Sequence, residues 1–218
     1  ALIHPDPVFT RVTAGEGVPD IRIIIYRGVP VMAMVRLPTE ASDGKANLHR
    51  GAIGAGIDIG AGITLGAVHR SRVVERHPDT GNPVNGILVP HWEEMLLIAA
   101  TVTEMTGLGY LGADFVLDRE RGPILLELNA RPGLAIQIAN RTGLRARLEA
   151  TDRAPAAMFA TAASRVAWAR QQFGRSAGPL AGLPSQGGPG VPPASEGDRY
   201  RAPEGGAAVP RSGERQAT

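Results

Sequence analysis

The alternation of apolar and polar positions is clearest in two short runs near the middle of the chain. Residues 113–117 and 124–129 each alternate along their length, and the polar link between them ends in Gly-Pro. This pattern predicts a β-hairpin. If the hairpin closes symmetrically, Asp114 lies opposite Glu127. Asn129 then shares their face, because successive side chains on a strand point to opposite sides.

A second hairpin is predicted nearer the start of the chain, after an irregular initial segment. The runs Asp20–Tyr26 and Val29–Leu37 are rich in apolar and β-branched residues, and Arg27-Gly28 separates them. Residues 23–25 are three consecutive isoleucines. A run without alternation is expected to be buried on both faces of a sheet.

The glycine-rich stretch 51–66 contains neither GxGxxG nor GxxxxGK[ST], so it does not match a phosphate-binding loop. Isoleucine and leucine residues alternate on either side of residues 60–62, which predicts a hairpin with bulges or close backbone contacts. His69 and His77 follow at a spacing that fits no metal motif, and both are expected at the surface.

Helical periodicity appears in the second half of the chain. Trp92–Thr106 carries apolar residues on one face, and Gly107 provides a natural end. Shorter helices are expected over about 134–142 and over 158–173. The chain is therefore predicted to be α+β, with a mostly antiparallel sheet flanked by helices.

The composition divides the chain into two parts. Residues 1–175 are expected to form one domain, whereas residues 176–218 are rich in Gly, Pro, Ala, Ser and Arg and have almost no large apolar side chains. Such a segment cannot bury enough surface to offset its ordering entropy, so a disordered C-terminal tail is predicted. Because the chain begins at Ala1 rather than Met, we expect it to be a fragment.

Composition also limits the function. The chain has 218 residues, 43% of them hydrophobic, and no cysteine, which excludes disulfides, thiolate metal sites and a cysteine nucleophile. A net charge of +2 and an aromatic content of 4% argue against nucleic-acid binding. No membrane span or signal peptide is visible. The absence of disulfides fits a cytosolic setting, so a cytoplasmic protein is expected. Its oligomeric state cannot be read from the sequence.

A pair of facing carboxylates is the first candidate for a functional site. Asp114 and Glu127 would repel each other as cross-strand neighbours, and a divalent cation between them would remove the repulsion. Two carboxylates and the amide carbonyl of Asn129 are hard oxygen ligands that suit Mg²⁺. The alternative is that all three are ordinary solvent-facing positions of a half-exposed hairpin.

Three separated motifs give these residues a context: Asp20-Ile21-Arg22, NLHRG at residues 47–51, and ELNARPG at residues 127–133. Together with Asp114, they resemble the metal-binding signature of the ATP-grasp superfamily over roughly residues 1–150. The chain looks most similar to the glutamate-ligase branch, in particular to alpha-L-glutamate ligase-like or sugar-transfer-associated ATP-grasp proteins. The fold that this resemblance implies is the C-terminal lobe of an ATP-grasp protein.

The resemblance implies a role for each motif. Asp114, Glu127 and Asn129 would hold two Mg²⁺ ions, with Mn²⁺ as an alternative. Contacts to ATP are implied for Asp20, Arg22, Asn47 and Leu126, the last beside the adenine. Arg36 and Arg50 would neutralise the transferring phosphoryl group, since a guanidinium meets phosphate oxygens with two donors and stays charged. Arg131 would hold a substrate carboxylate.

Simpler explanations remain for these charged residues. The hairpin over residues 20–37 carries three of them in or beside its strands, Asp20, Arg22 and Arg36. They could form an internal ion pair at the edge of a strand. Arg50 could lie in a mobile surface loop.

The reaction implied by the resemblance joins a small-molecule or peptide carboxylate to an amine through an acyl phosphate, using ATP. A non-catalytic ATP-grasp module in cell-surface polysaccharide assembly is the second hypothesis. Hydrolysis by paired carboxylates is the third, although it gives Asn129 no role.

Two features depart from the wider superfamily. Gly112 stands where the D-alanine–D-alanine ligase branch has an arginine. The resemblance also implies that the lobe with the lysines for the α- and β-phosphates precedes this chain. Catalysis by this chain alone is therefore in question.

Overall fold

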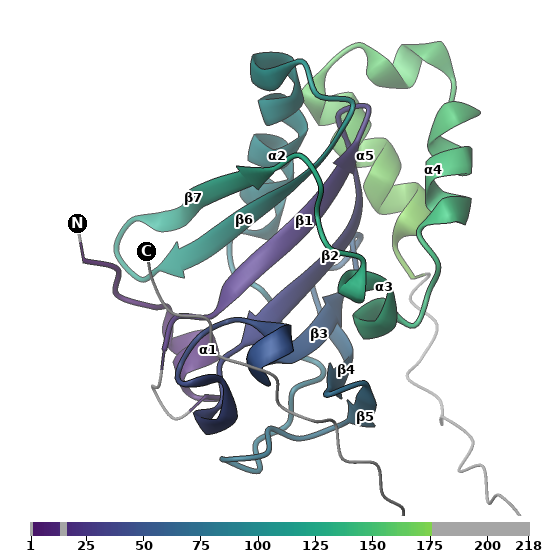
Figure 1. The fold of residues 1–218 in the computed structure, drawn as a ribbon. Helices are drawn as coiled ribbons and strands as arrows, with labels where there is room; N and C mark the ends of the chain where they lie inside the picture. Colours follow the sequence, from purple (N-terminus) through teal and green to yellow (C-terminus); the bar gives the residue numbers. More distant parts are fainter. Residues whose placement is uncertain (1, 14–16, 176–218) are drawn as a thin grey trace, which may run out of the picture. The chain divides into compact units, whose positions relative to one another are not determined.

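The computed structural model describes residues 2–13 and 17–175, and it shows a seven-stranded sheet (Figure 1). Every pair of neighbouring strands is antiparallel, as predicted. The strand order is β5-β4-β3-β2-β1-β6-β7. The strands are β1 (Asp20–Tyr26), β2 (Val29–Leu37), β3 (Ile53–Ile57), β4 (Thr64–His69), β5 (Arg72–Val74), β6 (Tyr110–Asp118) and β7 (Gly122–Asn129).

Helices cover both faces of the sheet (Figure 1). The longest two, α2 and α5, pack against each other and against the central strands, while α3 packs over β2, β3 and β4. The helices are α1 (Pro7–Thr10), α2 (Trp92–Thr106), α3 (Ala135–Asn140), α4 (Arg145–Asp152) and α5 (Ala162–Phe173). Three 3₁₀ turns connect other elements: η1 (Glu40–Ser42), η2 (Leu48–Arg50) and η3 (Ala156–Phe159).

Strand β1 lies next to the middle strand of the sheet, β2, and pairs with β6 on its other side. Its three consecutive isoleucines, residues 23–25, are fully buried, which confirms the expectation of burial on both faces. Most of β2 is buried as well. Polar side chains within these strands therefore stand out, because an unpaired charge is costly in such surroundings.

Helix α3 packs directly on the backbone of β3, because Gly54 and Gly56 offer no side chain beneath it. A Cβ atom built on Gly56 would lie 2.8 Å from the carbonyl oxygen of Ala139, too close for any other residue type. Asn140 then fixes the helix, since its Nδ2 donates to the carbonyl of Ala33 at 2.9 Å. This packing holds the start of α3 beside β1 and β2, where Arg22 and Arg36 lie.

The structure differs from the predictions in three places. Helix α4 was not expected, and α5 begins at Ala162 because Thr161 and Ser164 form a capping box. The prediction that His77 lies at the surface is wrong. It is 1% exposed, and its Nε2 lies 2.8 Å from the carbonyl oxygen of Pro38. The predicted disorder of residues 176–218 falls outside the described residues.

Across the described ranges, 2–13 and 17–175, no helix combines the length and the apolar content that crossing a membrane would require.

Candidate functional site

The strand register places five charged residues on one face of the sheet. Asp20 pairs with Arg36 across β1 and β2, and Arg22 pairs with Asp114 across β1 and β6. Asp114 also lies opposite Glu127 across β6 and β7, as the sequence predicted. Paired residues of neighbouring strands, and alternate residues of one strand, share a face. Four adjacent strands therefore build one charged surface.

Asp114 is the centre of an ion-pair network and is only 1% exposed. Arg22 binds it with two donors, Nε at 2.7 Å from Oδ1 and Nη2 at 2.5 Å from Oδ2. Arg36 donates Nη2 to Asp114 Oδ2 at 2.8 Å and also binds both carboxylate oxygens of Asp20. The internal ion pair that the sequence left open is therefore present. It holds both guanidinium groups in fixed orientations.

Two donors lie between the facing carboxylates of Asp114 and Glu127. Asn129 Nδ2 lies 3.3 Å from Asp114 Oδ2 and 3.0 Å from Glu127 Oε1. Arg22 Nη2 lies 4.0 Å from Glu127 Oε1. The protein itself thus relieves the repulsion that we expected a cation to relieve. The facing pair alone is no evidence for a metal.

A β-bulge interrupts strand β7 next to Glu127. Asp114 pairs with Glu127, but Phe115 pairs with Leu125, so Leu126 is an extra residue in the ladder. Leu126 is 50% exposed, and the side chain of Glu127 is 62% exposed. Both side chains are therefore accessible to a ligand, whereas Asp114 is almost completely covered.

Burial and pairing act in opposite directions on the acidic residues. Burial raises the pKa of Asp20 to about 6, although Arg36 opposes that effect. Burial also favours the neutral form of Asp114. The hydrogen bond from Arg22 and the charges of Arg36 and Arg22 outweigh it, so the pKa of Asp114 lies below its ordinary value. Asp114 is therefore ionised at neutral pH, as a metal ligand has to be.

Carboxylate and amide oxygens suit a divalent cation. The oxygen of Asp114 that shares the Asn129 donor with Glu127 is Oδ2. Asp114 Oδ2 already accepts three N–H groups, but Oδ1 accepts only one and keeps a lone pair. Glu127 accepts one hydrogen bond, from Asn129. A half-turn of the Asn129 amide would present its oxygen instead. No cluster of three His, Cys, Asp or Glu residues suited to a metal occurs in the described part of the chain.

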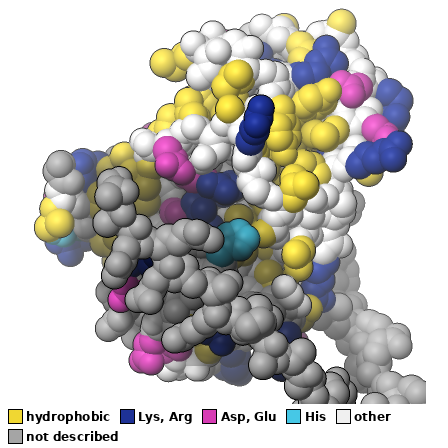
Figure 2. Space-filling view, in the orientation of Figure 1, with side chains coloured by type: hydrophobic (Ala, Val, Ile, Leu, Met, Phe, Trp, Pro, Cys, Tyr) yellow, Lys and Arg dark blue, Asp and Glu magenta, His cyan; other side chains and the backbone are white. Residues whose placement is uncertain are grey.

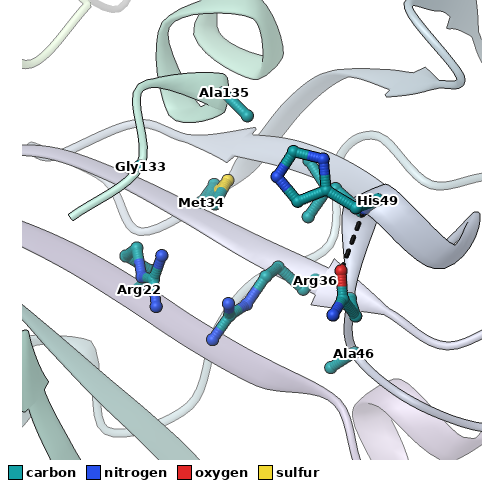
Figure 3. Close-up of a pocket in the computed structure, with 9 residues that line it drawn as sticks. Arg22, Met34, Arg36, Ala46, His49, Gly133 and Ala135 are labelled. Atoms are coloured by element: carbon teal, nitrogen blue, oxygen red, sulfur yellow. Dashed lines mark hydrogen bonds between the residues drawn. The ribbon is translucent and has the colours of Figure 1, made fainter. Parts of the chain in front are cut away.

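A pocket of about 200 Å³ opens beside the network (Figure 3). Arg22 and Arg36 line it from the sheet, Ala135 lines it from α3, and the segment before and within η2 contributes Asn47 and His49. Asn47 begins η2, because its Oδ1 accepts the backbone N–H of His49 at 2.9 Å. The structure thus brings Asn47 to the same pocket as the two arginines.

Two of the predicted arginines are not part of this pocket. Arg50 is exposed at the end of η2, and Arg131 is exposed between β7 and α3. Neither is among the residues that line the pocket. His49 does line it, and sequence reasoning missed this residue although it belongs to the NLHRG motif.

Gly112 has a structural explanation. A Cβ atom on Gly112 would lie 2.8 Å from Cβ of Pro132, so the turn after β7 packs directly against β6 at this point. An arginine could not stand there. Arg22 approaches Asp114 from the neighbouring strand instead.

Side chains of both charges gather on one face of the molecule, next to a histidine and below a band of hydrophobic side chains (Figure 2). Large apolar residues are also exposed on β7 (Leu126, Leu128), just before α3 (Leu134) and on α3 (Ile138), but Leu128 alternates with Glu127 and Asn129 and lies on the other face of the sheet. The face seen in Figure 2 combines apolar and charged areas, as many small-molecule sites do.

A mostly antiparallel sheet flanked by helices, with this mixed face, is consistent with one lobe of an ATP-grasp protein. The model of the family described as sugar-transfer associated ATP-grasp matches residues 1–153 of the 218. The chain belongs to this family. That confirms the resemblance to sugar-transfer-associated ATP-grasp proteins and supports an ATP-dependent ligase-like or ATP-binding function. No curated protein matches the chain.

Proposed function

We propose that this protein is an ATP-dependent ligase that joins a carboxylate to an amine. The observation that carries the proposal is the shared face of Asp114, Glu127 and Asn129 beside two oriented arginines. Membership in the ATP-grasp family supports a nucleotide as the ligand of this face. A site with cationic groups and no nucleophile suits a reaction in which charge develops on phosphoryl and carboxylate oxygens.

The proposed reaction has two steps. A substrate carboxylate accepts the terminal phosphoryl group of ATP to form an acyl phosphate, and an amine then displaces phosphate to form the amide. Arg36 would stabilise the negative charge of the phosphoryl group, and Arg22 would keep Asp114 ionised and oriented. Arg50 is proposed only as a secondary contact to the phosphoryl group, because it lies outside the pocket.

We propose that Asp114, Glu127 and Asn129 are the residues that hold Mg²⁺. When bound, Mg²⁺ would neutralise charge on the phosphate oxygens. The lone pair of Asp114 Oδ1 and the exposed carboxylate of Glu127 support this proposal. Leu126, exposed at the bulge beside Glu127, is proposed to contact the adenine, and Asp20 and Asn47 are proposed to lie near the phosphates.

A second candidate is a binding module without catalysis that acts with sugar-transfer proteins. The observation that favours it is the saturation of Asp114 Oδ2 by three N–H donors, which restricts how that carboxylate can bind a metal. Such a module would bind nucleotide but would not activate an acid.

Hydroxylamine trapping separates the two candidates. The protein is incubated with ATP, Mg²⁺, hydroxylamine and pools of small carboxylic acids, and hydroxamate and ADP are measured. The ligase proposal predicts a hydroxamate that requires ATP and is lost in Glu127→Gln. The control Glu149→Gln, at a half-exposed glutamate of α4, should behave as wild type. Binding of ADP without any hydroxamate would favour the binding module.

A further inference from the structure

His49 is the one ionisable side chain at the pocket that the proposed function does not use. Asn47 holds its backbone, which fixes where the side chain leaves η2. Figure 3 shows its ring above Arg22 and Arg36, with Met34 and Ala135 beside it. These side chains come from β1, β2, η2 and α3, so four elements line this small pocket.

The side chains at the floor of the pocket present hydrogen-bond donors and no negatively charged acceptor. Arg22 and Arg36 use Nε and Nη2 to bind Asp20 and Asp114. The Nη1 of each arginine makes no hydrogen bond to the described residues. Neither aspartate lines the pocket. The carboxylates therefore orient the guanidinium groups from behind, and a molecule in the pocket meets their free N–H edges.

The imidazole of His49 is also unused. Only its backbone N–H takes part in a hydrogen bond with the residues that the structure describes. A histidine ring carries at least one N–H donor in both its neutral and its charged form. The charged groups that line the pocket with it are Arg22 and Arg36, and α3 contributes the uncharged Ala135.

We infer that His49 is a third anion-binding residue of this pocket. Together with the free edges of Arg22 and Arg36, it binds a small oxyanion, which is either a phosphoryl group or the carboxylate of a small acid. Both kinds of anion occur in the proposed reaction, so the inference deepens that function. It depends only on the pocket, however, and can be tested without nucleotide. A volume of about 200 Å³ with Met34 and Leu48 in its wall has room for a short aliphatic group beside the anion.

The test is an NMR titration of the histidine Cε1–H signals at constant pH and ionic strength. Inorganic phosphate and sodium propionate are added in separate experiments. The chain has five histidines, and His49→Gln identifies the signal of interest. We expect a saturable shift of the His49 signal with phosphate, with propionate or with both, and the effective anion identifies the ligand class.

Variants then measure what the ring contributes. His49→Ala is expected to weaken binding of the effective anion about tenfold, as the loss of one hydrogen bond to a charged group does. His49→Gln keeps a donor and is expected to lose less. Because His49 is exposed, neither change should alter the fold, which circular dichroism would check.

His91 provides a matched control, since it is also exposed but lies at the start of α2 beside Glu94. Its signal should show no saturable shift, and His91→Gln should bind the anions as wild type does. The inference is overturned if the His49 signal moves no more than that of His91 with both anions. It is also overturned if His49→Ala leaves the affinity unchanged. Neither result would bear on Mg·ADP binding, which tests the proposed function separately.

Discussion

Single residues on the charged face are held in ionisation states that their burial alone would not produce. Asp114 is almost completely buried and yet ionised, because Arg22 and Arg36 supply three N–H donors to it. Asp20 accepts fewer hydrogen bonds, and its pKa of about 6 means that it titrates at mildly acidic pH. The network is therefore balanced between a charged and a partly neutral form at mildly acidic pH.

Asp20 makes stability depend on pH. Its pKa of about 6 in the folded protein exceeds the ordinary 3.8. The folded state thus binds the proton more tightly, and the contribution to stability is complete below about pH 4 and is lost as pH rises through 6. The loss is on the order of 3 kcal/mol. Urea denaturation of wild type between these pH values should show this decline. Asp20→Asn should flatten it, whereas Asp152→Asn, at a half-exposed carboxylate, should retain it.

Arg22 is predicted to matter more for stability than an exposed arginine in a similar ion pair. Arg22→Met removes two of the donors to buried Asp114 and should destabilise the protein by roughly 3 kcal/mol, as expected for a buried charge that loses its partner. Arg145→Met, which breaks the exposed pair with Glu149, should have little effect. Equal denaturation midpoints for the two variants would show that Asp114 does not depend on Arg22.

At the scale of elements, helix α2 ends where the sequence predicts, and a single backbone conformation produces that end. Gly107 has φ +67°, and a Cβ atom there would contact nothing within 4 Å. Gly107→Ala should therefore destabilise the protein by about 1 kcal/mol through backbone strain alone. Gly109→Ala is the control, since that residue is equally open without a positive φ. Thermal denaturation measures both, and equal melting temperatures would contradict the prediction.

Local patterns predicted most elements, and the exceptions have physical reasons. The hairpins and α2 were readable because alternation or helical spacing shows which side is buried. Helix α4 has no apolar stripe, and Thr151 is its only buried residue. His77 lies in a turn-like sequence, but it is buried by contact with Pro38, far away in the chain. Contacts of that kind cannot be read from neighbouring residues.

The site was predictable to the extent that it depends on strand pairing. A symmetric closure of the hairpin predicted Asp114 opposite Glu127, and this pair is observed. From Phe115 to Asp118 the ladder is shifted by one residue from that closure, and the bulge restores the predicted pairing. The bulge at Leu126 and the approach of η2 to the sheet required the tertiary structure. For that reason the NLHRG motif suggested Arg50, whereas the fold turns His49 toward the pocket.

At the scale of the whole molecule, a rigid sheet carries an accessible site. The central strands are buried on both faces, so the ion-pair network is attached to the densely packed core of the protein. The side chains proposed to meet the ligand, Glu127 and Leu126, lie on the edge strand β7 and are exposed. This arrangement suits a preorganised site that a nucleotide can reach.

Calorimetric titration of Mg·ADP into the wild type and into Glu127→Gln tests the central claim most directly. Removing one carboxylate from the proposed metal site should weaken binding by about tenfold or more. Glu149→Gln, the matched control on α4, should bind as wild type does. Weaker binding in Glu127→Gln alone is the predicted result. Equal binding by all three proteins, or no binding by the wild type, would contradict a nucleotide–metal site at Asp114, Glu127 and Asn129.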